Sequence, residues 1–266
     1  MKKKIITFAF LLITFSCTKI SPADSFYKKI LSISESFLDK PYSLGPLGEG
    51  KGIDPDPLYR EDRFDCLTYV ETVLAKTFST KENVKSTMNK IRYKNGVVSF
   101  VSRNHFQNPD WLNNSAKFLN NASQQISKSV LNKDSSKSKI VLDRKNWFKK
   151  NYNVDVDIEP EVVFLDYISL SDFHNNIEKF TKFIDKPYIF MTVISDKTLP
   201  SRVGTEIDVS HTGFLINKDN VLYLRHASSV AKKVIDEDFL NYVKKLQKNK
   251  KILGFSLIEI HELKLK

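Results

Sequence analysis

Apolar residues recur three or four positions apart in the stretch that follows Cys66, as they do along one face of a helix. The loop before this stretch is rich in proline and glycine and runs up to Asp65. The pattern therefore predicts that Cys66 stands at a helix N-terminus. The apolar positions on the predicted face are Leu67, Val70, Val73 or Leu74, and Phe78.

The same periodicities predict further elements along the chain. Helical spacing predicts helices over 25–38, 82–88 and 116–130, and a helix that begins with Ser171 or Asp172 as its N-cap and runs to 183. Alternating or β-branched runs predict strands over 97–101, 162–169 and 188–194. Residues 141–149 fit either a short helix or a strand, whereas 132–139 and 195–203 are typical of loops and turns.

A hairpin is the clearest strand pattern in the C-terminal third. Residues 209–216 and 221–228 are strand-like and are separated by a turn over 218–220. His211 lies near the outer end of the first strand and His226 near the outer end of the second. Because antiparallel pairing brings these ends together, we expect the two imidazoles to lie side by side.

Glycine and proline concentrate in residues 40–52, which hold four of the eight glycines in the chain. Such a stretch specifies backbone shape, either for tight turns or for close approach to a ligand. It lacks the strand, Gly-Lys-Ser/Thr and helix context of a phosphate-binding loop. Farther on, 103–114 is a loop dense in polar and aromatic residues, so Arg103, His105 and Trp111 are candidate substrate contacts. The alternative is a self-packed surface loop anchored by Trp111.

Composition indicates a globular protein with one large core. The chain has 266 residues, of which 41% are hydrophobic and 12% aromatic. Its formal charge is +11, to which the N-terminal lysines at 2–4 contribute three. A basic surface of this kind suits an anionic polymer or a membrane, but the lysines are spread along the chain without interleaved aromatics, so nucleic acid is not an expected partner.

The N-terminus has the pattern of a targeting segment. Three lysines precede the apolar run 5–15, which is short for a membrane span and suits a signal peptide. The segment ends in Thr14-Phe15-Ser16-Cys17, which resembles the lipobox of bacterial lipoproteins, although a leucine is usual where Thr14 stands. We therefore expect residues 1–17 to direct export and Cys17 to carry lipid, with a soluble exported protein as the alternative. Residues 18–24 would form a tether.

Cys66 is a candidate nucleophile. At a helix N-terminus, unpaired N–H groups and the helix dipole favour a thiolate. The alternative is a small buried core residue, since free cysteine is often buried. The chain has two cysteines, so if Cys17 is lipidated Cys66 has no disulfide partner. A nucleophilic cysteine needs a base and a third group that orients the base, and His211 and His226 can supply both.

Three blocks of the sequence resemble the NlpC-type papain-like cysteine hydrolases of bacterial cell walls. The blocks are Asp65-Cys66 at a helix start, Ser210-His211-Thr212-Gly213-Phe214 and Arg225-His226-Ala227-Ser228, and Lys40-Pro41-Tyr42 is similar to the same family's loop ahead of the nucleophile. More narrowly, 45–50, 64–72 and 103–114 resemble an N-acetylmuramoyl-L-alanine amidase-like subfamily. The likeness extends from about Tyr42 to Tyr242.

The resemblance implies roles for individual residues. Cys66 would be the nucleophile, His211 the general base and later acid, and His226 the orienting residue. Tyr42 would help to hold the oxyanion, and Asp65 matches a residue that pairs with a substrate amine in related peptidases. The common pattern has Ser-Gly after the cysteine, whereas this chain has Leu67-Thr68, so a serine contact to the substrate is missing. Thr68 is itself a candidate substrate-binding residue.

The expected fold is α+β, a papain-like domain over 25–266 with the nucleophile helix packed on an antiparallel sheet and an insertion at about 82–185. The expected activity is cleavage of the amide between N-acetylmuramic acid and L-alanine in peptidoglycan, without metal or organic cofactor, by an exported monomer in the periplasm or cell envelope. One alternative is a γ-D-glutamyl-diamino acid endopeptidase acting on stem peptides. Another is a non-catalytic lipoprotein that binds muropeptides. No His-Glu-x-x-His or Cys-x-x-Cys spacing occurs.

Overall fold

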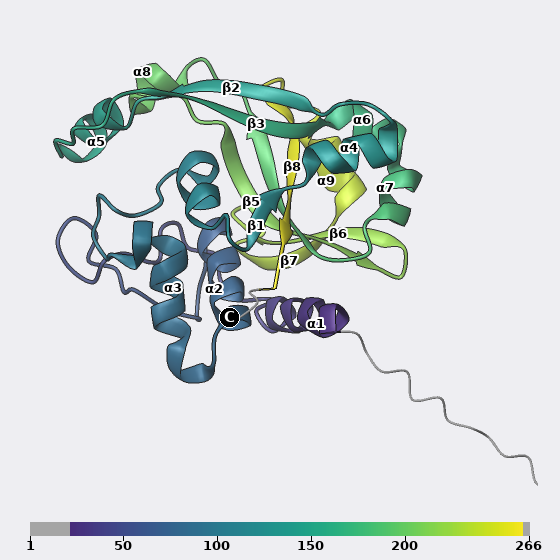
Figure 1. The fold of residues 1–266 in the computed structure, drawn as a ribbon, viewed down its shortest axis with the longest axis horizontal. Helices are drawn as coiled ribbons and strands as arrows, with labels where there is room; N and C mark the ends of the chain where they lie inside the picture. The colour runs from purple at the N-terminus through teal and green to yellow at the C-terminus, as the bar shows by residue number, and fades with distance from the viewer. Residues whose placement is uncertain (1–21, 263–266) are drawn as a thin grey trace, which may run out of the picture.

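The structure, a computed structural model, describes residues 22–262. One antiparallel β-sheet forms its centre (Figure 1). The order of its strands is β2-β3-β8-β4-β5-β6-β7, and β1 pairs separately with β8. The strands are β1 (Leu119–Asn121), β2 (Ser136–Leu142), β3 (Glu161–Ser169), β4 (Tyr188–Ile194), β5 (Val209–Lys218), β6 (Val221–Ser228), β7 (Lys233–Asp238) and β8 (Ile252–Ile260).

Helices cover both faces of this sheet. The α-helices are α1 (Pro22–Glu35), α2 (Cys66–Phe78), α3 (Val84–Arg92), α4 (Ser123–Leu131), α5 (Arg144–Tyr152), α6 (Leu170–Asn175), α7 (Ile177–Phe183), α8 (Leu199–Val203) and α9 (Phe239–Leu246). Shorter turns are the 3-10 segments η1 (Lys81–Asn83) and η2 (Lys94–Gly96) and the π-helical η3 (Gln107–Leu112). No helix within residues 22–262 combines the length and the apolar character needed to cross a bilayer.

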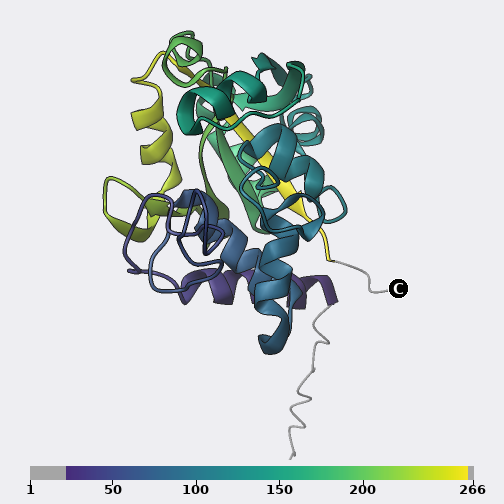
Figure 2. The ribbon, with the colours of Figure 1, turned by 90° about the vertical axis from the view of Figure 1, so that its left-hand side faces the viewer.

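The sheet separates two apolar cores. On one face, Tyr69 and Val73 of α2 pack with Phe214 and Ile216 of β5. On the other face, Phe239 of α9 packs with strand residues of opposite parity, because side chains alternate across a strand. In Figure 2, α9 stands at the left of the strands and α1 lies across the bottom. The prediction of an α+β fold with the Cys66 helix against an antiparallel sheet is confirmed.

The 209–228 hairpin forms as predicted. β5 and β6 pair from Phe214↔Arg225 to Lys218↔Val221. Asp219 and Asn220 both have positive φ at the tight turn, a conformation that Asp and Asn tolerate. The strand predictions over 162–169 and 188–194 are also confirmed by β3 and β4.

Other local predictions were wrong, two of them because strand pairing with distant residues overrode the local pattern. Residues 97–101 form a turn, not a strand, and Val97 and Val101 are exposed. The predicted helix 116–130 starts only at Ser123, because β1 pairs with the edge of β8 before it. The predicted loop 132–139 contains the start of β2, which pairs with β3 in the long hairpin at the top of Figure 1.

Helix boundaries also moved. α1 begins at Pro22, within the predicted tether, and ends at Glu35. α3 starts after a 3-10 turn and runs to Arg92, and the ambiguous stretch 141–149 divides between the end of β2 and α5. Ser169, not Ser171 or Asp172, caps α6, and a break at Asn176 separates α6 from α7. The turn-prone stretch 195–203 includes α8.

The segment proposed as an insertion, about 82–185, runs from η1 and α3 to the end of α7. It supplies β1 and β3, which pair with β8, so part of it belongs to the main sheet. Its β2–β3 hairpin reaches toward α5 and α8 in the upper left of Figure 1. The signal peptide and Cys17 lie outside the described residues.

Candidate active site

Cys66 is the first residue of α2, as predicted. Asp65 is the N-cap: its Oδ1 accepts hydrogen bonds from Thr68 N and Thr68 Oγ1, both at 2.8 Å. Thr68 Oγ1 in turn accepts from Asp65 N at 3.0 Å, which completes a capping box. Reciprocal capping fixes the first turn of the helix and, with it, the position of the cysteine.

The two histidines meet at one end of the β5–β6 hairpin, as predicted. His211 Nε2 lies 2.7 Å from His226 Nδ1, with the rings nearly perpendicular. The ladder between the strands stops at Phe214↔Arg225, and Gly213 faces His226 just beyond it. A Cβ atom at Gly213 would lie 2.8 Å from Cβ of His226, so glycine is what allows the second imidazole its position.

Cys66 lies beside the strand that carries His211. A hydrogen bond from the backbone N–H of Thr212, the residue after His211, lowers the pKa of the Cys66 thiol. The helix α2 also packs against β5. Tyr42 and Tyr242 also lie near the thiol. Both are close enough that a negative charge on the Cys66 sulfur would raise the pKa of their hydroxyl groups. The Tyr242 ring centroid lies 6.3 Å from that of His211 and 5.6 Å from that of His226. Residues from α2, β5, β6, α9 and the loop before α2 therefore converge here.

The resting protonation differs from the sequence-based expectation. We expected the helix N-terminus to favour a thiolate, but burial raises the pKa of Cys66 to about 12. The nearby Asp65 carboxylate raises it further, and the amides of Thr212, Leu67 and Cys66 only partly offset both effects. Burial also lowers the pKa of His211 to about 3, helped by His226. At neutral pH the thiol and the imidazole are therefore both neutral.

Glu237 of β7 is a neighbour that the sequence did not reveal. Its Oε2 lies 3.3 Å from His226 Nε2, and its Oε1 pairs with Lys245 of α9. The hydrogen bond with His226 lowers the pKa of Glu237 to about 2, so the carboxylate is ionised at neutral pH. The only sequence signal was the short apolar pair Val234-Ile235, because the acidic residues after it do not resemble a strand.

A cavity of about 720 Å³ opens beside the two histidines. Its lining includes the seryl residues Ser210 and Ser229, the highly exposed Val230, and Tyr242 and Lys245 of α9. A space of this size is within the range of small-molecule sites in proteins. It can receive a polar group of a substrate next to the dyad.

Asp65 and Thr68 have structural partners in place of the substrate contacts expected of them. Thr68 is almost fully buried and its hydroxyl belongs to the capping box. Asp65 uses its second oxygen to accept from Gly45 N at 3.1 Å, which ties the glycine-rich loop to the helix start. That loop makes tight turns, since Gly50 and Gly52 have positive φ.

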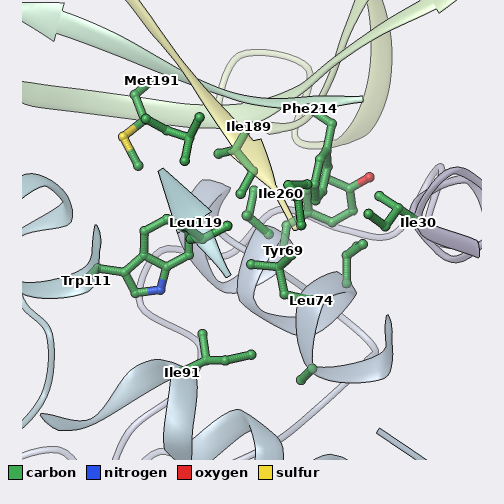
Figure 3. Close-up of a cluster of buried hydrophobic side chains, with 14 of the residues drawn as sticks. Ile30, Tyr69, Leu74, Ile91, Trp111, Leu119, Ile189, Met191, Phe214 and Ile260 are labelled. Atoms are coloured by element: carbon green, nitrogen blue, oxygen red, sulfur yellow. The ribbon is translucent and has the colours of Figure 1, made fainter. Parts of the chain in front are cut away.

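The 103–114 segment is also mainly structural. Trp111 was a candidate substrate contact, but the structure buries it completely among core residues such as Leu119 and Met191 (Figure 3). Arg103 is held by two hydrogen bonds to the Glu49 carboxylate and one to Asp54. The substrate-facing prediction is therefore wrong for Trp111.

His105 is packed between aromatic rings. Its Nε2 donates to the carbonyl oxygen of Phe100 at 2.7 Å, and its ring contacts Trp147 and Phe148 of α5. Burial lowers its pKa to about 3, so it is neutral. Arg103 and His105 line a second cavity, of about 850 Å³, which shares no lining residue with the cavity beside the dyad. The structure does not bring these two residues to the dyad.

The described residues contain no candidate metal centre. In the part of the chain covered by residues 22–262, no three His, Cys, Asp or Glu side chains come together in a way that could hold an ion. The groups around Cys66 are suited to proton transfer and to stabilising negative charge.

The site combines a thiol at a helix start, a pair of hydrogen-bonded imidazoles and nearby tyrosines on an α+β frame. Such a combination is able to perform acyl transfer. The profile of the AmiA-like family, described as N-acetylmuramoyl-L-alanine amidase-like, matches residues 32–252, and the chain belongs to this family. A comparison with curated proteins finds no match.

Solved structures share the fold. A protein from Legionella pneumophila superposes with a TM-score of 0.83 at 26% sequence identity, over 89% of each chain. An N-acetylmuramoyl-L-alanine amidase from Bacteroides uniformis superposes with a TM-score of 0.67 at 22% identity, over 90% of this chain and 100% of that one. The second likeness concerns the fold alone. The wider NlpC-type relationship stays a prediction.

Proposed function

We propose that this protein hydrolyses the amide between N-acetylmuramic acid and L-alanine in peptidoglycan, with Cys66 as the nucleophile. Membership of the amidase-like family supports the reaction class. The observation that carries the catalytic assignment is the 2.7 Å contact between His211 and His226 beside the strand segment next to Cys66. His211 is the general base and later acid, and His226 orients it.

The nitrogen that takes the proton follows from the contacts. Nε2 of His211 is occupied by His226, so Nδ1 is the atom left for the thiol. Because both groups start neutral, the proton moves as the sulfur attacks, and no preformed ion pair is required.

The reaction then proceeds through a thioester. Cys66 Sγ bonds to the carbonyl carbon of the lactyl amide, and its proton passes to His211. The C–N bond breaks, and His211 gives that proton to the departing L-alanine nitrogen. Water adds to the thioester carbon and transfers a proton to His211, the S–C bond breaks, and the proton returns to sulfur. The products are the sugar carboxylic acid and a free peptide amine.

Negative charge on the carbonyl oxygen needs donors placed in advance. Tyr42 is the proposed side-chain donor, together with the backbone N–H of Cys66. Tyr42 is well held, since its N–H donates to Lys232 O at 2.8 Å and its backbone bridges to Phe64. Burial and the neighbouring acidic groups raise the pKa of its hydroxyl, so it stays a proton donor.

The test is product analysis with a defined muropeptide that contains disaccharide and stem peptide. We expect wild type, but neither Cys66→Ala nor His211→Gln, to release intact disaccharide and a peptide that starts with free L-alanine, as read by mass spectrometry. His174→Gln is the matched control, because His174 is exposed on α6.

Three results would contradict the assignment. Cleavage after D-glutamate would make the protein an endopeptidase of the stem peptide. Equal turnover by wild type and Cys66→Ala would remove the thiol mechanism, and the absence of any turnover would favour a muropeptide-binding protein.

We also propose an exported, monomeric protein that is anchored to a membrane through lipid on Cys17, with peptidoglycan as its partner. The support is the lysine-flanked apolar run and the lipobox-like Thr14-Phe15-Ser16-Cys17. The lipid can be tested by measuring the intact mass of wild type and of Cys17→Ala extracted from membranes. A wild-type mass equal to that calculated without lipid would rule out lipidation.

A further inference from the structure

Glu237 holds a defined place behind the two histidines. In the β6–β7 ladder, Leu224 lies opposite Glu237 and His226 lies opposite Ile235. The glutamate is thus the diagonal neighbour of His226 on the same face of the sheet, within reach of a long side chain. Lys245, in the last turn of α9, pairs with its other oxygen and keeps the carboxylate turned toward β6.

The three groups form a line that leads away from the proposed nucleophile. His226 Nδ1 faces His211 Nε2 at 2.7 Å, and His226 Nε2 faces Glu237 Oε2 at 3.3 Å. Only one hydrogen can occupy each of these contacts, and a neutral imidazole carries one hydrogen. The hydrogen of either ring therefore decides the hydrogen of the other.

Two arrangements of hydrogens are possible in such a line. In the first, His226 donates through Nε2 to Glu237 and accepts at Nδ1 from Nε2–H of His211, which leaves Nδ1 of His211 with a free lone pair. In the second, His226 donates through Nδ1 to His211 Nε2, so His211 must carry its own hydrogen on Nδ1. Only the first leaves a base that can take a proton from Cys66.

We propose that Glu237 is a positioning residue that fixes the productive tautomer of His226 and, through it, that of His211. An ionised carboxylate can only accept a hydrogen bond, so the first arrangement satisfies the Glu237–His226 contact and the second leaves it without a hydrogen. Glu237 also stabilises the imidazolium that His211 becomes when it holds the thiol proton. The role in catalysis rests on the proposed function, but the tautomer itself does not.

The first experiment reads the tautomers directly, without turnover. Long-range ¹H–¹⁵N NMR spectra of the ¹⁵N-histidine-labelled protein distinguish an imidazole protonated on Nε2 from one protonated on Nδ1. In wild type at neutral pH we expect both His211 and His226 to be protonated on Nε2. In Glu237→Ala we expect a mixture or the reverse arrangement. Glu178→Gln, an exposed change on α7, should leave both rings as in wild type.

Glu237→Gln separates charge from shape, because an amide can either accept from His226 or donate to it. The tautomer proposal fails if Glu237→Ala keeps both rings fully protonated on Nε2 while the fold, checked by circular dichroism, is intact. If Cys66→Ala in the activity test shows that the thiol is not used, these spectra still decide the role of Glu237.

Activity gives a second readout. We expect Glu237→Gln to lower kcat by about tenfold to a hundredfold, with little change in KM, because the amide lacks the charge and no longer enforces one tautomer. The acid limb of kcat/KM should move to lower pH, because removing a negative charge makes protonated His211 less stable. The groups around His211 that bear on this limb are His226, Glu237 and Tyr242. Lys245 acts through its pairing with Glu237, and the Cys66 thiol lies on α2, which packs against β5.

Two results would overturn the catalytic part of the proposal. One is a change in KM with kcat and the pH limb unchanged, which would indicate a structural or substrate-contact role. The other is full activity in Glu237→Ala, since that variant lacks both the charge and the acceptor.

Discussion

Gly213→Ala tests whether the close approach of β5 to His226 sets the geometry of the dyad. The added Cβ would lie 2.8 Å from Cβ of His226, 2.9 Å from the carbonyl oxygen of Arg225 and 3.1 Å from Cδ1 of Leu224. All three residues have their backbone held in the β6–β7 ladder, and the two nearest atoms, Cβ of His226 and the carbonyl oxygen of Arg225, move only with that backbone. The contact cannot be relieved by turning a flexible side chain.

The size of the displacement can be worked out from these distances. Non-bonded carbons rest at about 3.5 Å or more, so His226 must move by roughly 0.7 Å. Its hydrogen bond to His211 is 2.7 Å long, and such a shift would stretch it to the edge of the useful range. Misplacements approaching 1 Å cost up to about a hundredfold in rate, and overpacking costs about 1–3 kcal/mol of unfolding free energy.

We therefore expect kcat/KM of Gly213→Ala on the muropeptide to fall by tenfold or more, with urea denaturation showing a loss of about 1–3 kcal/mol. Ile216→Val is the control, because it removes a buried methyl group from the same strand at a cost of about 0.5–1.5 kcal/mol without touching the dyad. Wild-type kcat/KM in Gly213→Ala would refute the argument. A loss of rate equal to that of Ile216→Val would show that general destabilisation is responsible.

Two other predictions concern Trp111 and His211. Trp111→Ala should lower the unfolding free energy by about 3–5 kcal/mol, and Trp111→Phe by less, because the indole is fully buried; a stable variant with a raised KM would restore the substrate-contact hypothesis. The folded pKa of His211, about 3, lies below its ordinary value of 6.5, so between these values the unfolded chain binds more protons and stability falls as pH drops. Urea denaturation from pH 7 to 4.5, above the window in which Glu237 titrates, should show a weaker pH dependence for His211→Gln than for wild type; parallel curves would mean that His211 is protonated in the folded state.

The strength of local patterns explains which elements could be predicted. The Cys66 helix has a continuous apolar face and a capping box formed by Asp65 and Thr68, which are only three positions apart. The hairpin has two strand-like runs around a tight turn. In both, neighbours in sequence make the decisive contacts. Cys66, His211 and His226 could therefore be placed correctly in their elements.

The predictions that failed concern residues whose structure depends on partners outside their own segment. Residues 119–121 form a strand only because β8 offers them an edge, although the local sequence suits a helix. Trp111 looked like an exposed recognition residue, but packing from other elements covers it. Thr68 looked like a substrate contact until the Asp65 backbone and carboxylate were seen to occupy its hydroxyl.

The sequence by itself determined the class of fold and the residues able to perform thiol chemistry, because capping, periodicity and turn preference act over a few residues. Only the tertiary structure decided their state. Burial by several elements keeps the Cys66 thiol and the His211 imidazole neutral, against the effect of the helix terminus. The β6–β7 ladder brings Glu237 to His226, a contact set by strand register and invisible as a motif. Desolvation and register depend on the whole fold, so no local pattern in the chain could reveal them.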